Sequence, residues 1–324
     1  MSNPLVSVVI SCYNRPAMLE SALQSVLSQT YRELEIIVHD DSTNDDCCRV
    51  VQSVADDRIV YIRNVPPLGT SANLRAGYRR SHGKYFCTLN DDDLYCPRYI
   101  ETMVVALERY ERCSVSFSDH FIINNDGSIN QAETEASRNR FGRDRFAEGV
   151  VPNALWVGLV LNSIPAMFAL FRRQAMDLDD FPIEVSSGYD YWLTYLALRG
   201  GQHAYYTPQR LTCYRVHGGS QSAGFSDLPE RLRYFEYRRY IHERFLADPR
   251  LKSVHPALQP RLAQVHASTG LALVRLGNRR KALRQFLTAW RVTPCWSALF
   301  GVLLCCFPST LLRRVRRTPV SQNI

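Results

Sequence analysis

The sequence predicts an α/β protein in which a mostly parallel central sheet is flanked by helices and followed by a C-terminal helical extension. Three observations support this prediction. From residue 5 to about residue 206, short runs rich in β-branched residues alternate with longer segments of helical periodicity, as in repeated βαβ units. The short runs are apolar at successive positions, which is typical of strands buried on both faces. From about Asp227 onward the pattern is helical.

The elements of the predicted sheet follow in a regular order. The first strand is predicted at LVSVVIS (5–11), and Pro16 begins a helix with apolar residues at helical spacing. Further strands are predicted at 34–40, 58–63 and 84–89, and helices at 47–55 and 71–81. Later segments predict an antiparallel hairpin around Asp126 and Gly127, a helix over 188–201 closed by glycine, and short strands within 203–217.

The length and composition indicate a globular protein with more than one part. A chain of 324 residues exceeds the usual size of a single compact domain. Its 46% hydrophobic and 22% charged residues argue against a disordered chain and against a multi-span membrane protein. We place the boundary within GGSQSAGFSD (218–227), which divides the chain into an α/β domain, 1–222, and a basic helical extension, 223–324.

The positive charge is concentrated near the C-terminus. Residues 251–324 hold 12 Lys or Arg and no Asp or Glu, which leaves 27 basic and 31 acidic residues in the rest of the chain. Such a split predicts that the extension meets an anionic surface, either phospholipid headgroups or nucleic acid; a solvated helix face is the alternative. No nucleic-acid recognition module is apparent in the sequence, so phospholipid is favoured.

One segment of the extension has the composition of a membrane-interface helix. PCWSALFGVLLCCFPSTLLRRVRR (294–317) contains about 14 largely apolar residues between prolines, fewer than the roughly 20 that a spanning helix requires. Four arginines follow this stretch, and Trp290 and Trp296 flank it. We therefore expect the segment to lie in the cytoplasmic membrane interface. The alternative is a helix that folds back onto the body of the protein.

The N-terminus and the cysteines predict a reducing compartment. The first residues lack the basic region and the small-residue cleavage site of a secretory signal. Ten cysteines are scattered without CxxC spacing, which indicates neither a zinc site nor a disulfide framework. We expect a cytoplasmic protein, peripheral on the inner face of the plasma membrane where the extension binds it.

Three consecutive aspartates, Asp91 to Asp93, follow the strand predicted at 84–89. Adjacent carboxylates repel one another unless a cation or hydrogen-bond donors compensate them. Mg²⁺ or Mn²⁺ would do so and leave positions for the phosphates of a nucleotide; capping of a helix that begins at Pro97 is the alternative. Polar clusters also follow the strands at 5–11 and 34–40. Ligands of such sheets bind beyond the carboxyl ends of the strands, so a shared site is expected there.

The ordered motifs resemble those of the family 2 glycosyltransferases. They are VSVVISCYNRPAMLESALQSVLSQTYRELEIIVHDDST, LGTSANLRAG, GKYFCTLNDDDLYCPRYI, GYDYWLTYLALRGG and YRVHGGSQS. Each motif is degenerate alone, whereas all five in this order are specific, and together they cover roughly residues 4–220. The resemblance implies the GT-A fold and an enzyme that transfers sugar from a nucleotide-diphosphate donor.

The resemblance also implies the roles of individual residues. The donor nucleotide would be bound by Ser11, Tyr13, Asn14, Arg15, Asp40, Asp41, Arg75 and Asp91. A divalent metal, Mn²⁺ or Mg²⁺, would be ligated by Asp92, with Asp93 and His217 as further candidate ligands. Asn90 departs from the family pattern, because it stands where the metal-binding motif usually has Asp.

The last implied role is that of the catalytic base. Asp190 matches the base position of inverting members, on a helix whose usual Glu-Asp pair is here Tyr189-Asp190. The resemblance thus implies an inverting transferase, with a UDP-sugar as the favoured donor. Its acceptor would be a hydroxyl of a glycan or glycolipid in cell-surface polysaccharide synthesis.

Two other function classes are compatible with the fold. A sugar nucleotidyltransferase would need a glycine-rich basic phosphate loop after the first strand, but SCYNRP has no glycine. A non-catalytic binding or scaffold protein would have no need of Asp92 and Asp190, both of which are present. The sequence therefore favours the transferase.

Overall fold

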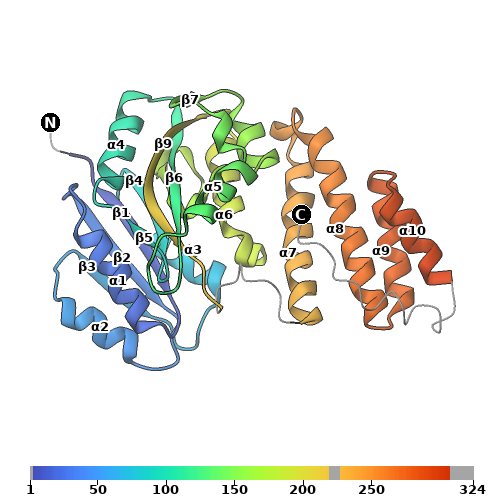
Figure 1. Ribbon diagram of the computed structural model, residues 1–324, viewed down its shortest axis with the longest axis horizontal. Helices are drawn as coiled ribbons and strands as arrows, with labels where there is room; N and C mark the ends of the chain where they lie inside the picture. Colours follow the sequence, from blue (N-terminus) through green and yellow to red (C-terminus); the bar gives the residue numbers. More distant parts are fainter. Residues whose placement is uncertain (1–2, 219–226, 307–324) are drawn as a thin grey trace. The chain divides into compact units, whose positions relative to one another are not determined.

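The computed structural model describes residues 3–218 and 227–306. Contacts within the chain separate two compact units, residues 1–223 and 224–324. Figure 1 shows the sheet of the first unit and the helices of the second.

The first unit is built on one sheet. Its strands are β1 (Val6–Cys12), β2 (Leu34–Asp40), β3 (Ile59–Arg63), β4 (Tyr85–Asn90), β5 (Leu94–Tyr95), β6 (Cys113–Ile123), β7 (Gly149–Val151), β8 (Ala169–Arg172) and β9 (His203–Arg215). They lie in the order β3-β2-β1-β4-β8-β6-β9-β5, with β7 beside β9. The helices are α1 (Pro16–Leu27), α2 (Asp46–Val54), α3 (Thr70–Arg80), α4 (Tyr99–Arg109), α5 (Gln131–Arg140) and α6 (Tyr189–Leu198).

The sheet is parallel in its first half and mixed in its second. Strands β3, β2, β1 and β4 are mutually parallel, as predicted. Strand β8 runs antiparallel to both β4 and β6. The hairpin expected near Asp126 is reduced to a single bridge between Ile123 and Ile129. The short strands expected within 203–217 form one 13-residue strand, β9, whose pairing with β6 shifts register. Such shifts bend a strand locally and increase its twist.

Helices cover both faces of the sheet (Figure 1). The even-numbered residues of β1 pack in one core with residues of α1, α2 and α4. The odd-numbered residues face α3, where a Cβ on Gly77 would come 2.5 Å from a methyl carbon of Val9. Glycine therefore lets α3 lie close to the strand. This alternation follows from the period of two along a strand.

A substitution at Gly83 would test the close packing of the sheet. A Cβ at this position would lie 2.5 Å from the carbonyl oxygen of Tyr85 and 2.7 Å from the amide nitrogen of Ser7, and neither backbone atom can move without disturbing the sheet. Gly83→Ala should therefore lower the free energy of unfolding by about 2 kcal/mol, as measured by urea titration. Gly218→Ala is the matched control, because no atom of the described residues lies within 4 Å of its added methyl. Equal stability of the two variants would contradict the packing.

The described residues of the second unit, 227–306, form helices. They are α7 (Leu228–Ala247), α8 (His255–Arg275), α9 (Arg279–Val292) and α10 (Trp296–Cys306). Phe286 of α9 lies in the core between α8 and α10, next to Gly270 and Gly301. In the ranges that the structure describes, no helix is both long and apolar enough to cross a membrane. The segment predicted to lie at a membrane interface, 294–317, includes α10, and its last 11 residues lie outside the described ranges.

Candidate active site

The carboxyl ends of β1, β2 and β4 lie level with one another. Ser11 of β1 pairs in register with His39 of β2 and with Asn90 of β4. Beyond these pairs, the Asp41 amide donates to the carbonyl of Cys12 (3.0 Å), and the Asp91 amide donates to the carbonyl of Ser11 (3.2 Å). The polar clusters after the three strands are thus held at one edge, as the sequence predicted.

Arg15 forms ion pairs with both carboxylates of the cluster after β4. Its Nη2 lies 2.5 Å from Asp91 Oδ1, its Nε donates to Asp91 Oδ2 (3.2 Å), and its Nη1 donates to Asp92 Oδ2 (2.6 Å). Burial raises the pKa of Asp91 to about 7, against the lowering effect of Arg15. Burial alone would lower the pKa of Arg15, but the two carboxylates raise it. The cluster therefore needs a cation, and here the guanidinium supplies it.

His217 lies beside the same pair. Its Nε2 is 3.1 Å from Asp92 Oδ2 and 3.3 Å from Arg15 Nη1. The His217 side chain is 9% exposed and that of Asp92 12%, so both lie at the edge of the buried region. Mn²⁺ accepts both oxygen and nitrogen ligands. The Asp92 carboxylate and the His217 imidazole are therefore suitable ligands for this ion. Asp92 and His217 are thus brought together as the prediction of a metal site requires.

Asp93 points away from that pair into the protein. It is fully buried; its Oδ1 accepts from the Arg215 amide (2.9 Å) and its Oδ2 from the Asn90 side chain (3.2 Å). Burial and the neighbouring Asp92 raise the pKa of Asp93 well above its ordinary value. The Arg215 side chain in turn donates to the carbonyl of Asp92 (2.9 Å). This placement does not favour Asp93 as a metal ligand and indicates a brace that holds the backbone of Asp92.

Asp190 lies in the first turn of α6, on the face of the sheet opposite α1. It is half-buried, and its Oδ1 accepts a hydrogen bond from the Tyr191 amide (2.7 Å). The preceding residue, Tyr189, donates from its hydroxyl to Asn90 Oδ1 (2.8 Å). The two residues that depart from the family pattern, Asn90 and Tyr189, are therefore hydrogen-bonded to each other. This bond ties the helix that carries Asp190 to the strand end that carries Asp91 and Asp92.

The loop after β1 is held against the loop after β2. Asn14 adopts a φ of 54°, a left-handed conformation that asparagine tolerates better than most residues. Its amide donates to Ser42 Oγ (2.8 Å), and its side-chain oxygen accepts from the Thr43 amide (2.9 Å). Asp41 is buried and accepts from the amides of Leu68 (3.2 Å) and Gly69 (2.8 Å). Both residues thus shape the backbone around the expected nucleotide position.

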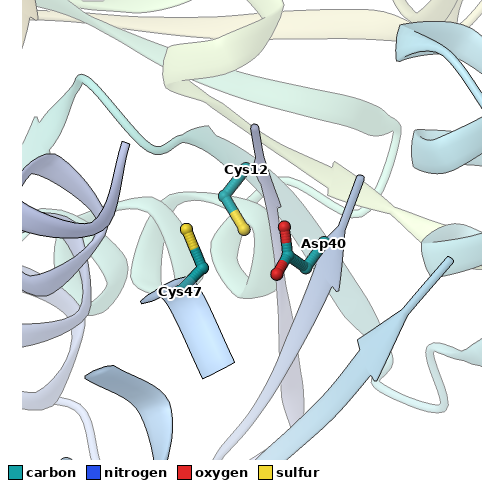
Figure 2. Close-up of side chains that lie close together, drawn as sticks. All are labelled: Cys12, Asp40 and Cys47. Carbon is teal, nitrogen blue, oxygen red and sulfur yellow. The ribbon is translucent and has the colours of Figure 1, made fainter. Parts of the chain in front are cut away.

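Asp40 belongs to a buried cluster that the cysteine spacing did not indicate. Figure 2 shows Asp40 with Cys12 and Cys47, whose potential ligand atoms all lie within 4.8 Å of one another. The Asp40 oxygens already accept from the Ser42 amide (2.7 Å) and from the Tyr61 hydroxyl (2.6 Å). A hydrogen bond from the Cys12 thiol lowers the pKa of Cys47 to about 6. Because its carboxylate is satisfied by protein donors, we interpret this cluster as a support beneath the loop after β2.

Of the remaining predicted residues, Ser11 and Tyr13 lie at the end of β1, whereas Arg75 contacts the segment before α6 instead of the acidic cluster. Ser11 is half-buried at the end of β1. Tyr13 is 52% exposed, and its amide donates to Asp91 Oδ2 (3.1 Å). Arg75 lies on α3, and its guanidinium donates to the carbonyl of Phe181 (3.4 Å). Tyr13 therefore presents its ring to solvent next to the acidic cluster, while Arg75 joins α3 to the segment before α6.

Sequence reasoning missed two residues of this site, Tyr189 and Arg215. Tyr189 stood out only as a departure from the family pattern, and its partner could not be read from the chain. Arg215 lies two residues before His217 in the motif YRVH. Its closeness to a predicted metal ligand was the only sequence signal that could have pointed to it. Both support residues that were predicted to contact metal or nucleotide.

Comparisons with known proteins show the family to which the chain belongs. A family model described as Glycosyl transferase family 2 matches residues 7–175, just over half of the chain. The UDP-Glc:alpha-D-GlcNAc-diphosphoundecaprenol beta-1,3-glucosyltransferase WfaP of Escherichia coli is 28% identical over 223 residues, which cover 68% of this chain and 80% of that protein.

Two solved structures share the fold. The crystal structure of S. aureus TarS in complex with UDP-GlcNAc aligns with a TM-score of 0.64 and 14% identity, covering 90% of this chain and 82% of that one. The mannosyltransferase PcManGT from Pyrobaculum calidifontis, in complex with GDP-Man and Mn²⁺, aligns with a TM-score of 0.54 and 15% identity, covering 97% and 84%. The predicted GT-A fold is confirmed, and the chain is a glycosyltransferase that belongs to family 2.

Proposed function

We propose that the protein transfers a sugar from a nucleotide-diphosphate donor, with UDP-sugar favoured, to a hydroxyl of a lipid-linked glycan, with inversion at the anomeric carbon. The observation that carries the proposal is the cluster of Asp91, Asp92, Arg15 and His217 at the strand ends, which α6 joins to Asp190. In this cluster two carboxylates, Asp91 and Asp92, surround the Arg15 guanidinium. A metal ion bound to a nucleotide diphosphate would need carboxylate ligands placed in the same way.

The donor would bind across the ends of β1, β2 and β4. Asp41 and Asn14 fix the loops that would surround the nucleotide base, and the exposed Tyr13 would lie beside that base. Asp91 would accept from the ribose hydroxyls. A divalent cation, Mn²⁺ or Mg²⁺, held by Asp92 and His217 would stabilise the charge that develops on the leaving diphosphate. The Mn²⁺ in the complex of PcManGT supports this choice of ion.

The transfer itself needs one base. The acceptor oxygen forms a bond to the anomeric carbon as the bond from that carbon to the diphosphate oxygen breaks. Asp190 accepts the proton of the acceptor hydroxyl, and the electron pair of the broken bond leaves with the diphosphate. Attack from the face opposite the leaving group inverts the anomeric centre.

The acceptor class is inferred from the relative in Escherichia coli, whose name specifies a diphosphoundecaprenol-linked acceptor and a UDP-Glc donor. An acceptor of this type is held in a membrane, so the enzyme would work at the cytoplasmic face of the plasma membrane, in cell-surface polysaccharide synthesis. We expect the full-length protein to transfer labelled sugar to a polyprenyl-diphosphate-linked glycan.

The test begins with the donor. Thermal shift measured with UDP-, GDP- and dTDP-sugars, with and without Mn²⁺, should single out one nucleotide whose effect depends on the ion. Transfer to the lipid-linked glycan is then measured with that donor. A protein that binds no nucleotide sugar under any of these conditions would refute the proposal. A protein that binds the donor and transfers it only to water-soluble glycans would refute the acceptor class alone.

Arg15 should exchange partners when the donor binds. In the structure its guanidinium forms ion pairs with both Asp91 and Asp92. In the absence of nucleotide it therefore competes with a metal ion for these carboxylates. Arg15→Ala should raise the affinity for Mn²⁺ alone by about tenfold, because the carboxylates lose their cation, and should lower the affinity for UDP with Mn²⁺ by about tenfold, because the diphosphate loses a charged donor.

The free Mn²⁺ signal in electron paramagnetic resonance measures the first effect, and calorimetry with UDP the second. Arg32→Ala, which removes an exposed arginine after α1, is the matched control and should change neither. If the affinity of Arg15→Ala for Mn²⁺ falls or stays unchanged, Arg15 does not compete with the ion.

A further inference from the structure

We propose that α10 is a membrane-docking helix, which lies in the interface of a bilayer with anionic headgroups. The proposal concerns the second unit alone and goes beyond the proposed function, since transfer at the strand ends of the first unit does not require it. It rests on an apolar surface of α10, here called the docking face, and on the basic residues of α9 before it.

The docking face is a continuous apolar stripe. It consists of Trp296, Leu299, Phe300 and Leu303, whose exposed fractions are 84%, 38%, 58% and 49%. Their spacing of three, four and seven residues puts them on one side of a helix. Large aromatic side chains rarely gather in water without a partner. The stripe therefore requires an occupant.

Among the described residues, the core of the second unit does not include this stripe. Ala298, on the opposite side of α10, is fully buried and packs with Phe286 and its neighbours. Gly301, also on that side, allows the Phe286 ring to approach closely. The helix WSALFGVLLCC has no charged residue, so it is apolar on the face that packs and on the face that does not. A helix apolar all round is expected in contact with protein on one side and with another apolar phase on the other.

The basic residues near α10 indicate that the apolar phase is a bilayer with anionic headgroups. Exposed basic side chains lie on α9 at Arg280, Arg284 and Arg291, and Arg291 is five residues before Trp296. Residues 251–324 contain no Asp or Glu. A second copy of the chain would bring two basic surfaces together, whereas phospholipids with anionic headgroups attract them. Tryptophan beside arginine is typical of helices that lie in the headgroup region.

The length of the helix sets its orientation. At 11 residues, α10 would extend about 16 Å along its axis, about half the thickness of the hydrocarbon core. A span is thus excluded for α10, and insertion parallel to the surface remains. In this orientation the aromatic side chains reach the acyl boundary while the arginines of α9 stay among the headgroups.

The test is sedimentation of the full-length protein with vesicles. Vesicles of phosphatidylcholine alone are compared with vesicles of equal parts phosphatidylcholine and phosphatidylglycerol, at low and at high salt. We expect the wild type to bind the anionic vesicles about tenfold more strongly than the neutral ones, and the preference to disappear at high salt. The double variant Trp296→Ser, Phe300→Ser should bind the anionic vesicles about tenfold less than the wild type.

Two further variants keep the test decisive. Val65→Ser with Val105→Ser removes exposed apolar side chains of the first unit, 81% and 61% exposed, and should bind as the wild type does. Arg280→Gln with Arg284→Gln should reduce only the anionic preference. UDP-induced thermal shift in each variant checks that the first unit is intact. Wild-type protein that binds no vesicles, or a Trp296, Phe300 variant that binds as well as the wild type, would overturn the proposal. So would a stable dimer that this variant abolishes.

Discussion

Replacing Asp190 with asparagine should lower the rate of sugar transfer by about 10³-fold and leave donor binding unchanged. The amide keeps the size of the side chain and can still accept the hydrogen bond of the Tyr191 amide, but it cannot take a proton from the acceptor. The rate is measured at saturating donor and acceptor, and UDP binding by calorimetry in the presence of Mn²⁺.

A control separates catalysis from helix stability. Because Asp190 lies in the first turn of α6, its loss also removes a favourable charge from a helix N-terminus, worth about 0.5 kcal/mol. Glu230→Gln makes the same change in the first turn of α7, so it should cost similar stability and leave the rate intact. Turnover of Asp190→Asn near the wild-type rate would show that another group is the base. Loss of both turnover and UDP binding would indicate a structural role for Asp190.

Replacing Asp92 with asparagine should abolish metal-dependent donor binding and lower transfer by about 10³-fold. Asp92 is the carboxylate that faces both His217 and Arg15, and an amide oxygen binds a divalent ion far more weakly than a carboxylate does. Binding of Mn²⁺ in the presence of UDP is measured by the loss of the free-ion resonance signal.

Asp93 provides the matched control for this change. Burial raises its pKa well above the ordinary value. Asparagine keeps the size of the side chain and can still accept the hydrogen bond of the Arg215 amide. We expect Asp93→Asn to keep Mn²⁺ binding within about threefold of the wild type and to change mainly the free energy of unfolding. If Asp93→Asn lost the ion as completely as Asp92→Asn, Asp93 would be a ligand and the assignment of a brace would be wrong.

Much of the fold was predictable because local patterns determine it. The runs that became β1, β2 and β4 are apolar at successive positions and end in polar residues, so both the strands and their shared edge could be read from the sequence. The antiparallel β8 was not predicted, because a four-residue strand carries no pattern that distinguishes its direction. The register shifts of β9 depend on its pairing with β6, which no local pattern in the sequence indicates.

The candidate site was predictable in its residue types and less so in its contacts. Asp91 and Asp92 stand out as like charges that need compensation. That Arg15 would be the compensating group was not predictable, since 76 and 77 residues separate it from them. The buried position of Asp93 depends on where β9 brings the Arg215 amide. The link from Tyr189 to Asn90 likewise depends on the placement of α6. Such contacts arise between elements far apart in the chain, where sequence patterns give no distance.

The most direct test of the central claim is the anomeric configuration of the product. Full-length protein is incubated with Mn²⁺, the α-linked nucleotide sugar selected by thermal shift and a lipid-linked glycan, and the new linkage is read by nuclear magnetic resonance. One displacement, with Asp190 as base on the face opposite the diphosphate, predicts a β linkage in every product molecule. An α linkage would contradict the account, because it requires either two displacements or attack from the side of the leaving group.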